Sequence, residues 1–283
     1  MKVLLYGSTG WIGGYMKEYL KEHEVIGAKT RLEDYANIGK ELDEVKPTHL
    51  LLAGGKTGRP NIDWCETHKI ETLETNTIGT AVLASECARR GIHLTYVGTG
   101  CIYEYDVEHS MGGKGFTEED TPNFDKSYYS YGKIITEKIL KEYDNVLILR
   151  IRMPISSDLH SRSFVTKITK YEKVVNIPNS MTILEDLLPL VPDMMEKNKT
   201  GIYNFCNPGV ISHNEILDLY REYIDTEFKY TNFTLEEQAK VIVAPRSNNC
   251  LDVGKLLREY PGVVEIKEGM RRVFEKMREN IRE

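Results

Sequence analysis

The sequence predicts an α/β fold in which a doubly wound parallel sheet is joined to a smaller C-terminal α+β lobe that binds substrate. Three observations lead to this prediction. Short β-rich runs alternate with helical stretches in the first half, the first strand leads directly into a glycine-rich turn, and the alternation stops near Pro154. Apolar strands separated by helices are typical of a parallel sheet that is covered on both faces.

The first half supplies the sheet and its helices in order. We expect strands over 2–7, 23–28, 48–55, 92–99 and 145–153, and helices over 13–23, 74–91 and 127–144. Beyond Pro154, prolines interrupt a mixture of short strands and helices, and a capping box at 212–215 begins another helix. We therefore expect a cofactor-binding domain over 1–155, with a strand returning to its sheet near 201–206, and a substrate lobe over 156–283.

The composition is that of an ordinary globular protein. The chain has 283 residues, of which 41% are hydrophobic and 28% charged, and its net charge of −6 argues against a nucleic-acid partner. No apolar run reaches the length of about 20 residues that spans a membrane, and the apolar start is too short for a signal peptide. Five scattered cysteines without a CxxC motif favour reduced thiols and a cytoplasmic location, and no histidine spacing predicts a metal site.

The turn after the first strand has the pattern of a dinucleotide site. Three glycines form G-x-x-G-x-x-G between a strand and a helix, which permits a tight turn and close approach of the backbone to a pyrophosphate. This pattern predicts a Rossmann-type domain, although a plain tight turn is the alternative interpretation. The cofactor contacts expected here are Gly7, Ser8, Thr9, Gly10, Trp11, Ile12 and Gly13.

The end of the second strand indicates which nicotinamide cofactor binds. Lys29, Thr30 and Arg31 follow that strand, where an acidic residue would favour NAD. Cations at this place suit the 2′-phosphate of NADP, so we expect NADPH to be preferred while NADH remains possible. The alternative is an exposed cationic loop with no ligand.

Two further patterns concern the chemistry. Tyr129 and Lys133 form a Y-x-x-x-K motif on a predicted helix, so both side chains lie on one face. So short a motif arises easily by chance, and its position after the fourth β-strand of a nucleotide-binding fold carries the evidence. Thr99 and Cys101 lie two residues apart at the end of that strand, where alternate side chains point the same way.

Together these residues resemble the extended short-chain dehydrogenases/reductases. More closely, the chain is similar to the plant bifunctional nucleotide-rhamnose synthases, which are 3,5-epimerase/4-reductases. The resembling stretches run from residue 6 to about residue 249 and include YGSTGWIGG, PTHLLLAGGKTGRPNIDWCE, TGCIYEYD, RMPISSD, IPNSMTILEDLLP, NPGVISHNEIL and FTLEEQAKVIVAPRSNN.

The resemblance implies an NADPH-dependent conversion of a nucleotide-linked 4-keto-6-deoxyglucose to nucleotide-L-rhamnose, and the plant enzymes lead us to expect UDP as the nucleotide. Thr99 and Tyr129 would hold the 4-keto oxygen, and Tyr129 would donate a proton during reduction. Lys133 would bind the nicotinamide ribose and lower the pKa of the tyrosine. Ala53, Gly54, Met153 and Pro154 would also contact the cofactor.

The resemblance also implies a catalytic role for Cys101. A ketone at carbon 4 acidifies carbons 3 and 5, and inverting these centres requires a base and an acid, for which the family implies Cys101 and Lys167. Without the resemblance, Cys101 is more simply a small buried residue and Lys167 a solvated helix position.

The substrate contacts are expected from two regions. Thr57, Arg59 and Asn61 follow the third strand, whereas Asn179, Arg246 and Asn249 lie in stretches that match the family; ordinary loops are the alternative. Asn76 matches a family asparagine near the active-site strand, or is a helix N-cap.

The expected partners are a nucleotide sugar, a separate 4,6-dehydratase and a second copy of the chain in a homodimer. The dehydratase is expected because the dehydratase half of the plant enzymes is absent from this chain, so another enzyme must supply the substrate. Two other functions remain open: a 4-reductase alone, like dTDP-4-dehydrorhamnose reductase, and a non-catalytic nucleotide-binding regulatory subunit.

Overall fold

Six strands form the main sheet of the computed structural model, which describes residues 1–59 and 61–282. The order across the sheet is β2-β1-β3-β4-β5-β7. The bounds of these strands are Lys2–Tyr6 (β1), Glu24–Gly27 (β2), His49–Leu52 (β3), His93–Thr99 (β4), Val146–Ile151 (β5) and Gly201–Asn204 (β7). The doubly wound sheet expected from the alternating pattern is therefore confirmed.

The chain adds its strands on opposite sides of β1: β2 lies on one side, and β3 and the later strands lie on the other. Leu4 of β1 pairs with Ile26 of β2 on one side and with Leu50 of β3 on the other, and both pairings are parallel. β3 continues in parallel to β4, where Leu50 pairs with Leu94. Ligands of open α/β sheets bind at the carboxyl ends of the strands where the chain changes sides in this way. The glycine-rich turn after β1 lies at this point.

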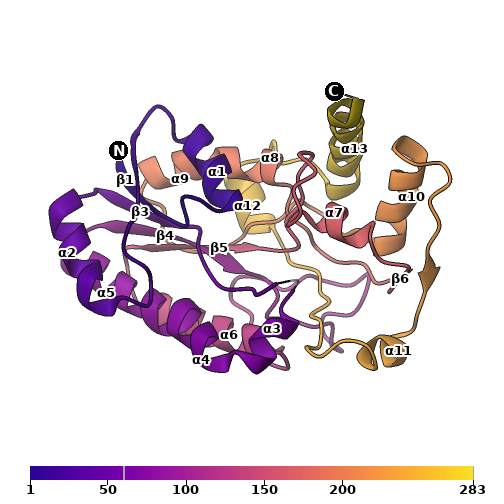
Figure 1. The fold of residues 1–283 in the computed structure, drawn as a ribbon, viewed down its shortest axis with the longest axis horizontal. Helices are drawn as coiled ribbons and strands as arrows, with labels where there is room; N and C mark the ends of the chain where they lie inside the picture. Colours follow the sequence, from indigo (N-terminus) through magenta and orange to yellow (C-terminus); the bar gives the residue numbers. More distant parts are fainter. Residues whose placement is uncertain (60, 283) are drawn as a thin grey trace. The chain divides into compact units, whose positions relative to one another are not determined.

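Helices cover both faces of the sheet (Figure 1). The helices α1 and α9 lie on one side, and α2, α5 and α6 lie on the other. The bounds are Trp11–Tyr19 (α1), Tyr35–Val45 (α2), Asp63–Thr67 (α3), Lys69–Leu73 (α4), Glu74–Gly79 (η1, a π-helix), Thr80–Arg89 (α5), Tyr128–Leu140 (α6), Leu188–Leu190 (η2, a 3₁₀-helix) and Val191–Glu196 (α9).

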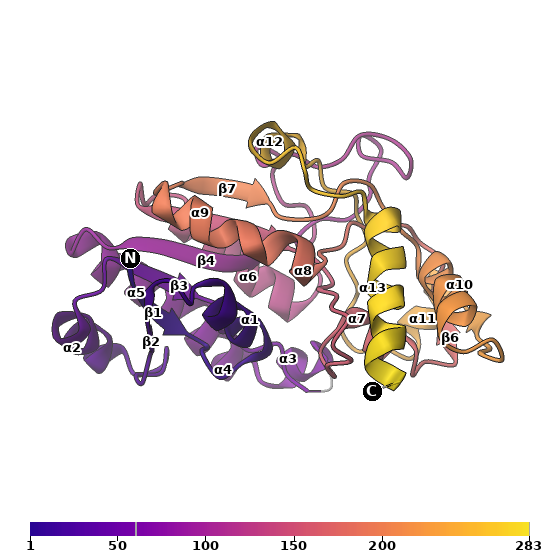
Figure 2. The same cartoon turned by 90° about the horizontal axis from the view of Figure 1, so that it is seen from above.

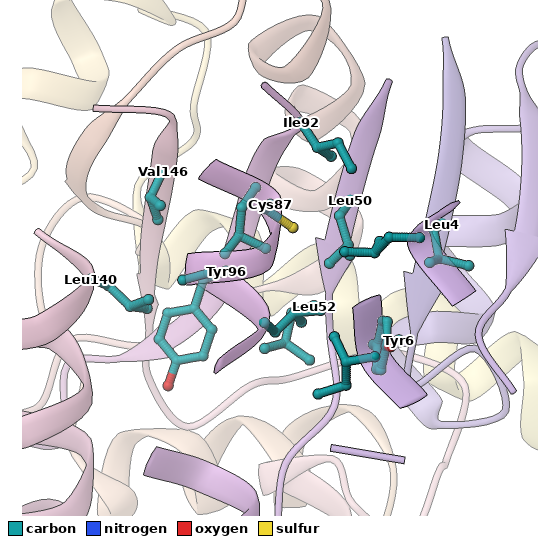
Figure 3. Packing of buried hydrophobic residues seen from close by; sticks show 14 of the residues in the cluster. Leu4, Tyr6, Leu50, Leu52, Cys87, Ile92, Tyr96, Leu140 and Val146 are labelled. Atoms are coloured by element: carbon teal, nitrogen blue, oxygen red, sulfur yellow. The ribbon is translucent and has the colours of Figure 1, made fainter. Parts of the chain in front are cut away.

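The core of this unit forms where one face of the sheet meets its helices (Figure 3). Leu4, Leu50 and Leu94 come from adjacent strands, and Leu83 and Cys87 from α5 pack on them. All five are fully buried. Apolar strands that contain no exposed side chain fit a sheet covered by helices, as the sequence pattern predicts.

A second unit contains a two-stranded parallel sheet and several helices (Figure 2). Its long final helix α13 packs against α10, and their apolar faces share one core. The predicted capping box is present at the start of α10, between Ser212 and Glu215. The bounds are Phe164–Ile168 (α7), Lys173–Val174 (β6), Leu184–Leu187 (α8), His213–Tyr223 (α10), Thr231–Asn232 (β8), Leu235–Ala239 (α11), Gly254–Glu259 (α12) and Ile266–Arg282 (α13).

The chain passes between the two units more than once. The first unit comprises 1–102, 122–150 and 188–203, and the second comprises 103–121, 151–187 and 204–283. The sequence predicts one boundary near residue 155 and a strand that returns to the sheet. It does not anticipate that 103–121 joins the second unit, where backbone hydrogen bonds connect Phe116 with Cys250 and Asp252.

No helix within 1–59 and 61–282 combines the length and apolarity needed to cross a membrane. Among these residues no three His, Cys, Asp or Glu side chains gather in a way that could hold a metal ion.

Candidate active site

Thr99, Cys101 and Tyr129 meet at the carboxyl end of β4. The Thr99 hydroxyl oxygen accepts the backbone N–H of Cys101 at 3.0 Å, and the same hydroxyl is hydrogen-bonded to the Tyr129 phenol. Tyr129 and Thr99 are buried, while Cys101 is half-buried. The structure thus brings together three of the residues that the sequence singled out.

The start of α6 fixes the position of Tyr129. Ser127 caps the helix by accepting the backbone N–H of Ser130 at 3.1 Å, and the Glu66 carboxylate accepts the N–H of Tyr128 at 2.7 Å. The Ser130 hydroxyl donates to the carbonyl of Cys101 at 2.7 Å. Free N–H groups of the first helical turn are satisfied in this way, and the segment that carries Cys101 is tied to the helix that carries Tyr129.

The electrostatics around Tyr129 keep its phenol protonated. Burial raises the pKa of Tyr129 well above its ordinary value, and a negative charge on Cys101 would raise it further. The hydrogen bond with Thr99 acts in the opposite direction but is outweighed. The expectation of a lowered tyrosine pKa is therefore wrong for this structure, because desolvation disfavours the phenolate. Such a phenol is a donor of hydrogen bonds and protons.

Lys133 lies one helical turn after Tyr129 on the same face of α6. Its ammonium is 5.7 Å from the centre of the Tyr129 ring and donates a hydrogen bond to the Tyr96 hydroxyl at 2.8 Å. Burial lowers the pKa of Lys133 to about 8, and the neighbouring Cys65 opposes this shift. A buried amine of this kind exchanges its proton close to neutral pH.

A π-helix holds the loop that follows β3. Asn76 lies in η1, where its side chain accepts the backbone N–H of Lys56 and donates to the carbonyl of the same residue, each at 2.7 Å. Asn76 therefore acts as a clamp on this loop and not as the helix N-cap that the sequence allowed. The wider π-helical turn also exposes the carbonyl of Asn76 to the Thr136 hydroxyl on α6, at 2.9 Å.

The glycine-rich turn is shaped to receive a dinucleotide. Gly7 has a φ of +80°, and a Cβ atom there would lie 2.8 Å from the Cα atom of Gly54. A Cβ atom on Gly13 would lie 2.1 Å from the carbonyl oxygen of Gly7. Because any side chain at these two places would fill the turn, the first turn of α1 stays open to an anion. The residues therefore fit the pyrophosphate of a dinucleotide.

A buried carboxylate binds the backbone of the loop after β2. Glu41 on α2 accepts the backbone N–H of Lys29 at 2.6 Å and that of Thr30 at 3.2 Å, as well as the Tyr6 hydroxyl at 3.0 Å. The side chains of Lys29 and Arg31 remain exposed. The loop thus presents its cations on a backbone that is fixed before any ligand arrives.

The substrate residues predicted after β3 differ in their surroundings. Thr57 and Arg59 are exposed, whereas Asn61 is half-buried and accepts the backbone N–H of Asp63 at 2.8 Å, which orders the start of α3. Thr57 and Arg59 are thus the members of this set whose side chains face solvent.

The remaining predicted residues belong to the second unit. Lys167 lies half-buried on α7, where burial lowers its pKa and the charge of Arg162 lowers it further. Met153 has a φ of +37°, a strained conformation directly before Pro154. Strain of this kind concentrates at ligand sites. Arg246 is half-buried and donates to the carbonyl of Ala244 at 2.5 Å.

Asn179 and Asn249 face the interior of this unit. The Asn179 carbonyl oxygen accepts hydrogen bonds from the Arg152 guanidinium at 2.6 Å and from the backbone of Asn249 at 3.0 Å. The Asn249 amide donates to the carbonyl of Tyr103 at 2.9 Å. Both asparagines are fully buried, and their side chains order this network.

Several positions at the site are missed by sequence reasoning. Four residues hold the helix α6 or the strand beside it: Glu66, Tyr96, Ser130 and Thr136. Only Ser130 carries a local signal, because it follows a serine N-cap by three residues. The other three act across elements distant in the sequence, and no spacing rule brings them together.

Comparisons with known proteins find relatives over nearly the whole chain. The model of the NAD dependent epimerase/dehydratase family matches residues 3–171. A bifunctional dTDP-4-dehydrorhamnose 3,5-epimerase/dTDP-4-dehydrorhamnose reductase from Arabidopsis thaliana is 56% identical over 271 residues, which cover 94% of this chain and 90% of the relative.

A trifunctional protein from the same plant shares part of its length with this chain. It is a UDP-glucose 4,6-dehydratase/UDP-4-keto-6-deoxy-D-glucose 3,5-epimerase/UDP-4-keto-L-rhamnose-reductase and is 55% identical over 274 residues. The match covers 95% of this chain but only 41% of that relative, so the chain spans about two fifths of the trifunctional protein.

Among solved structures, the L780 UDP-rhamnose synthase from Acanthamoeba polyphaga mimivirus superposes with a TM-score of 0.93. It is 42% identical in sequence, and the match covers 98% of this chain and 99% of the viral protein. A dTDP-4-dehydrorhamnose reductase from Bacillus anthracis, at 20% identity and a TM-score of 0.81, shares the fold.

Proposed function

The chain belongs to the NAD dependent epimerase/dehydratase family, and from this premise we propose that it is an NADPH-dependent 3,5-epimerase/4-reductase. Its substrate is a UDP-linked 4-keto-6-deoxyglucose and its product a nucleotide-L-rhamnose. The observation that carries the proposal is the meeting of Thr99, Cys101 and Tyr129 at the end of β4. The similarity to rhamnose-forming relatives over nearly the whole chain supports the substrate class.

One oxyanion site serves both reactions. Tyr129 and Thr99 hold the 4-keto oxygen, on which negative charge develops whether a proton leaves a neighbouring carbon or a hydride arrives at carbon 4. The raised pKa of Tyr129 keeps this donor protonated through the epimerisations. In the reduction, the Tyr129 hydroxyl transfers its proton to the oxygen, and the product is the alcohol.

Epimerisation needs a base that is ionised while Tyr129 is not. The Cys101 thiolate removes the proton from carbon 3 or carbon 5, and the electron pair moves to the keto oxygen as an enolate. Lys167 returns a proton on the opposite face and inverts the centre. The charge of the thiolate disfavours ionisation of Tyr129, so base and acid remain distinct.

The chain's own residues also provide for the cofactor. Gly7 and Gly13 leave room for the pyrophosphate, Arg31 pairs with the 2′-phosphate, and Lys133 binds the nicotinamide ribose. When bound, the nicotinamide supplies the hydride for carbon 4. The exposed cations at 29 and 31 support NADPH over NADH.

The test is a single incubation in D₂O with UDP-4-keto-6-deoxyglucose and NADPH, followed by NMR of the product. The proposal predicts a rhamnose configuration with deuterium at carbons 3 and 5 and protium at carbon 4. Reduction without deuterium at carbons 3 and 5 would identify a reductase alone. No consumption of NADPH would contradict both enzymatic functions, and a parallel incubation with the dTDP-linked sugar compares the two bases.

A further inference from the structure

The Tyr96 side chain joins the core of the first unit to the catalytic helix. Its ring lies on β4 among buried aliphatic groups that include Leu52, Leu140 and Val146 (Figure 3). The hydroxyl oxygen lies at the edge of this cluster. With 2% of its surface exposed, the ring is fixed by packing. A phenol held in this way places its oxygen at a defined point with little loss of conformational freedom on binding a partner.

The partner of this oxygen is the ammonium of Lys133. The Nζ–Oη distance is 2.8 Å, and Lys133 is 7% exposed. A buried ammonium requires a hydrogen-bond acceptor, because water no longer solvates its charge. The Tyr96 hydroxyl supplies such an acceptor, and it does so from a strand of the sheet that is more rigid than a loop.

A second contact engages the nearest acid on the helix that carries Lys133. Glu137 follows Lys133 by four residues and is thus its neighbour on the surface of α6. Both carboxylate oxygens of Glu137 are engaged by the Arg150 guanidinium, at 2.7 and 2.9 Å. This buried bidentate pair engages Glu137, and the Lys133 ammonium donates to the Tyr96 hydroxyl instead.

We propose that Tyr96 is a positioning residue that holds the Lys133 ammonium beside Tyr129 and toward the nicotinamide ribose. This inference rests on the proposed function for its catalytic meaning, whereas the contact itself is independent of substrate. Tyr96 does not touch the reacting atoms in this role. It acts by fixing where the positive charge of Lys133 lies and how readily that charge is lost.

The test follows the proton of Lys133 by NMR, with ¹³C at the Cε atom of lysine and the signal assigned from a Lys133→Met variant. In the unmodified protein the titration midpoint is expected at a pH of about 8. In Tyr96→Phe the charged amine loses its acceptor, so the midpoint falls by roughly one pH unit. An unchanged midpoint overturns the proposal.

A control and a second measurement make the result specific. Tyr103→Phe removes another buried hydroxyl, which donates to the carbonyl of Asp120 at 2.7 Å, and must leave the Lys133 midpoint unchanged. In the unmodified protein, the Cζ signal of Tyr96 must shift with the same midpoint as Lys133. This measurement decides the question even if Tyr96→Phe does not fold, because independent titrations would overturn the proposal.

The activity assay separates this inference from the proposed function. With UDP-4-keto-6-deoxyglucose and NADPH, the basic limb of the pH profile for reduction is expected to move down in Tyr96→Phe by the same amount as the NMR midpoint. If the unmodified protein consumes no NADPH, the proposed function fails while the titration still decides the role of Tyr96. If reduction occurs but its pH profile is the same in both proteins, the positioning role fails alone.

Discussion

The Thr99 hydroxyl accepts the backbone N–H of Cys101 at 3.0 Å, and this bond fixes the two residues relative to each other. The Thr99 hydroxyl also has a proton to donate, and it is hydrogen-bonded to the Tyr129 phenol. Cys101 lies close enough for its charge to act on the pKa of Tyr129. A hydroxyl and a thiol two residues apart thus share one site, and this arrangement makes separable predictions.

The first prediction concerns the Thr99 hydroxyl. Thr99→Val keeps the shape of the side chain but removes the hydrogen bond, so one of two donors to the keto oxygen is lost. We expect both NADPH oxidation and deuterium exchange at carbons 3 and 5 to fall by roughly 100-fold. Thr99→Ser restores the hydroxyl and is the matched control. Loss of only one of the two activities in Thr99→Val would contradict a shared oxyanion site.

The second prediction separates the two reactions at Cys101. Cys101→Ala removes the base, so deuterium exchange at carbons 3 and 5 should fall by at least about 100-fold. Reduction of a sugar already inverted at these carbons should persist, because Thr99 and Tyr129 still hold the oxygen. Cys250→Ala, a half-buried thiol of the second unit, is the matched control. Exchange that survives in Cys101→Ala would remove the cysteine from the mechanism.

The local elements of this site are predictable from sequence because they depend on neighbours along the chain. The glycines of the first turn, the alternation of the strands and the capping box at Ser212 and Glu215 each involve residues within one or two helical turns. Tyr129 and Lys133 also lie on one helix. Sequence patterns capture such relationships, since backbone geometry sets them directly.

The rest depends on contacts between elements distant in the sequence. Tyr96 is a strand residue 37 positions from Lys133. Nothing in the neighbouring sequence distinguishes it from an ordinary core aromatic. Asn179 and Asn249 lie in loop-like stretches, yet the buried Arg152 guanidinium holds Asn179 inward, and Asn179 in turn accepts the backbone N–H of Asn249. A buried charge recruits whichever acceptors the fold brings to it, and their identity follows from tertiary packing.

The third prediction concerns the cofactor. Glu41 fixes the backbone of Lys29 and Thr30, so Arg31→Ala should remove a charge without disturbing the loop. Loss of a charge-assisted hydrogen bond to a 2′-phosphate should raise the KM for NADPH about 10-fold or more and leave that for NADH nearly unchanged. Steady-state kinetics with both cofactors measure this. The control is Arg89→Ala, which removes an exposed arginine paired with Glu86. Equal changes in the KM for NADPH and for NADH in Arg31→Ala would exclude Arg31 as a contact of the 2′-phosphate.

The fourth prediction is that Lys133 reduces the stability of the fold. Its pKa is lowered from 10.5 to about 8, so between these values the unfolded chain binds more protons than the folded one. Below pH 8 the lysine is charged in both states, so the folded state bears the full cost of burying that charge. The free energy of unfolding then rises as the pH increases toward 10.5. At pH 7 the free energy of unfolding of Lys133→Met should be higher by roughly 2 kcal/mol, after allowance for the lost bond to Tyr96. Urea unfolding measures this difference.

This advantage should narrow steadily between pH 8 and pH 10.5, because the unmodified lysine becomes neutral in both states. The variant should also lose reduction. A variant that is less stable than the unmodified protein at pH 7 would show that the contacts of Lys133 outweigh the cost of burying its charge.

The fifth prediction concerns acid and the second unit. The His213 ring packs against Phe164 with 5.2 Å between ring centres, and its Nε2 atom is buried without a hydrogen-bond partner among residues 1–59 and 61–282. Burial and, to a smaller extent, the charge of Arg152 lower the pKa of His213 to about 4. From pH 6.5 down to about 4 the unfolded chain therefore binds more protons, and the folded state loses stability as the pH falls.

The measurement is urea unfolding of the unmodified protein and of His213→Gln at pH 7 and pH 5. An amide preserves a hydrogen bond to the carbonyl of Val175 but does not titrate. Between these pH values the unmodified protein should lose about 2 kcal/mol more than the variant. His160→Gln, at a half-buried histidine of the same unit, is the control and should change with pH as the unmodified protein does. Equal losses in His213→Gln and the unmodified protein would mean that His213 becomes charged within the fold without cost, and that the acid sensitivity of this unit has another source.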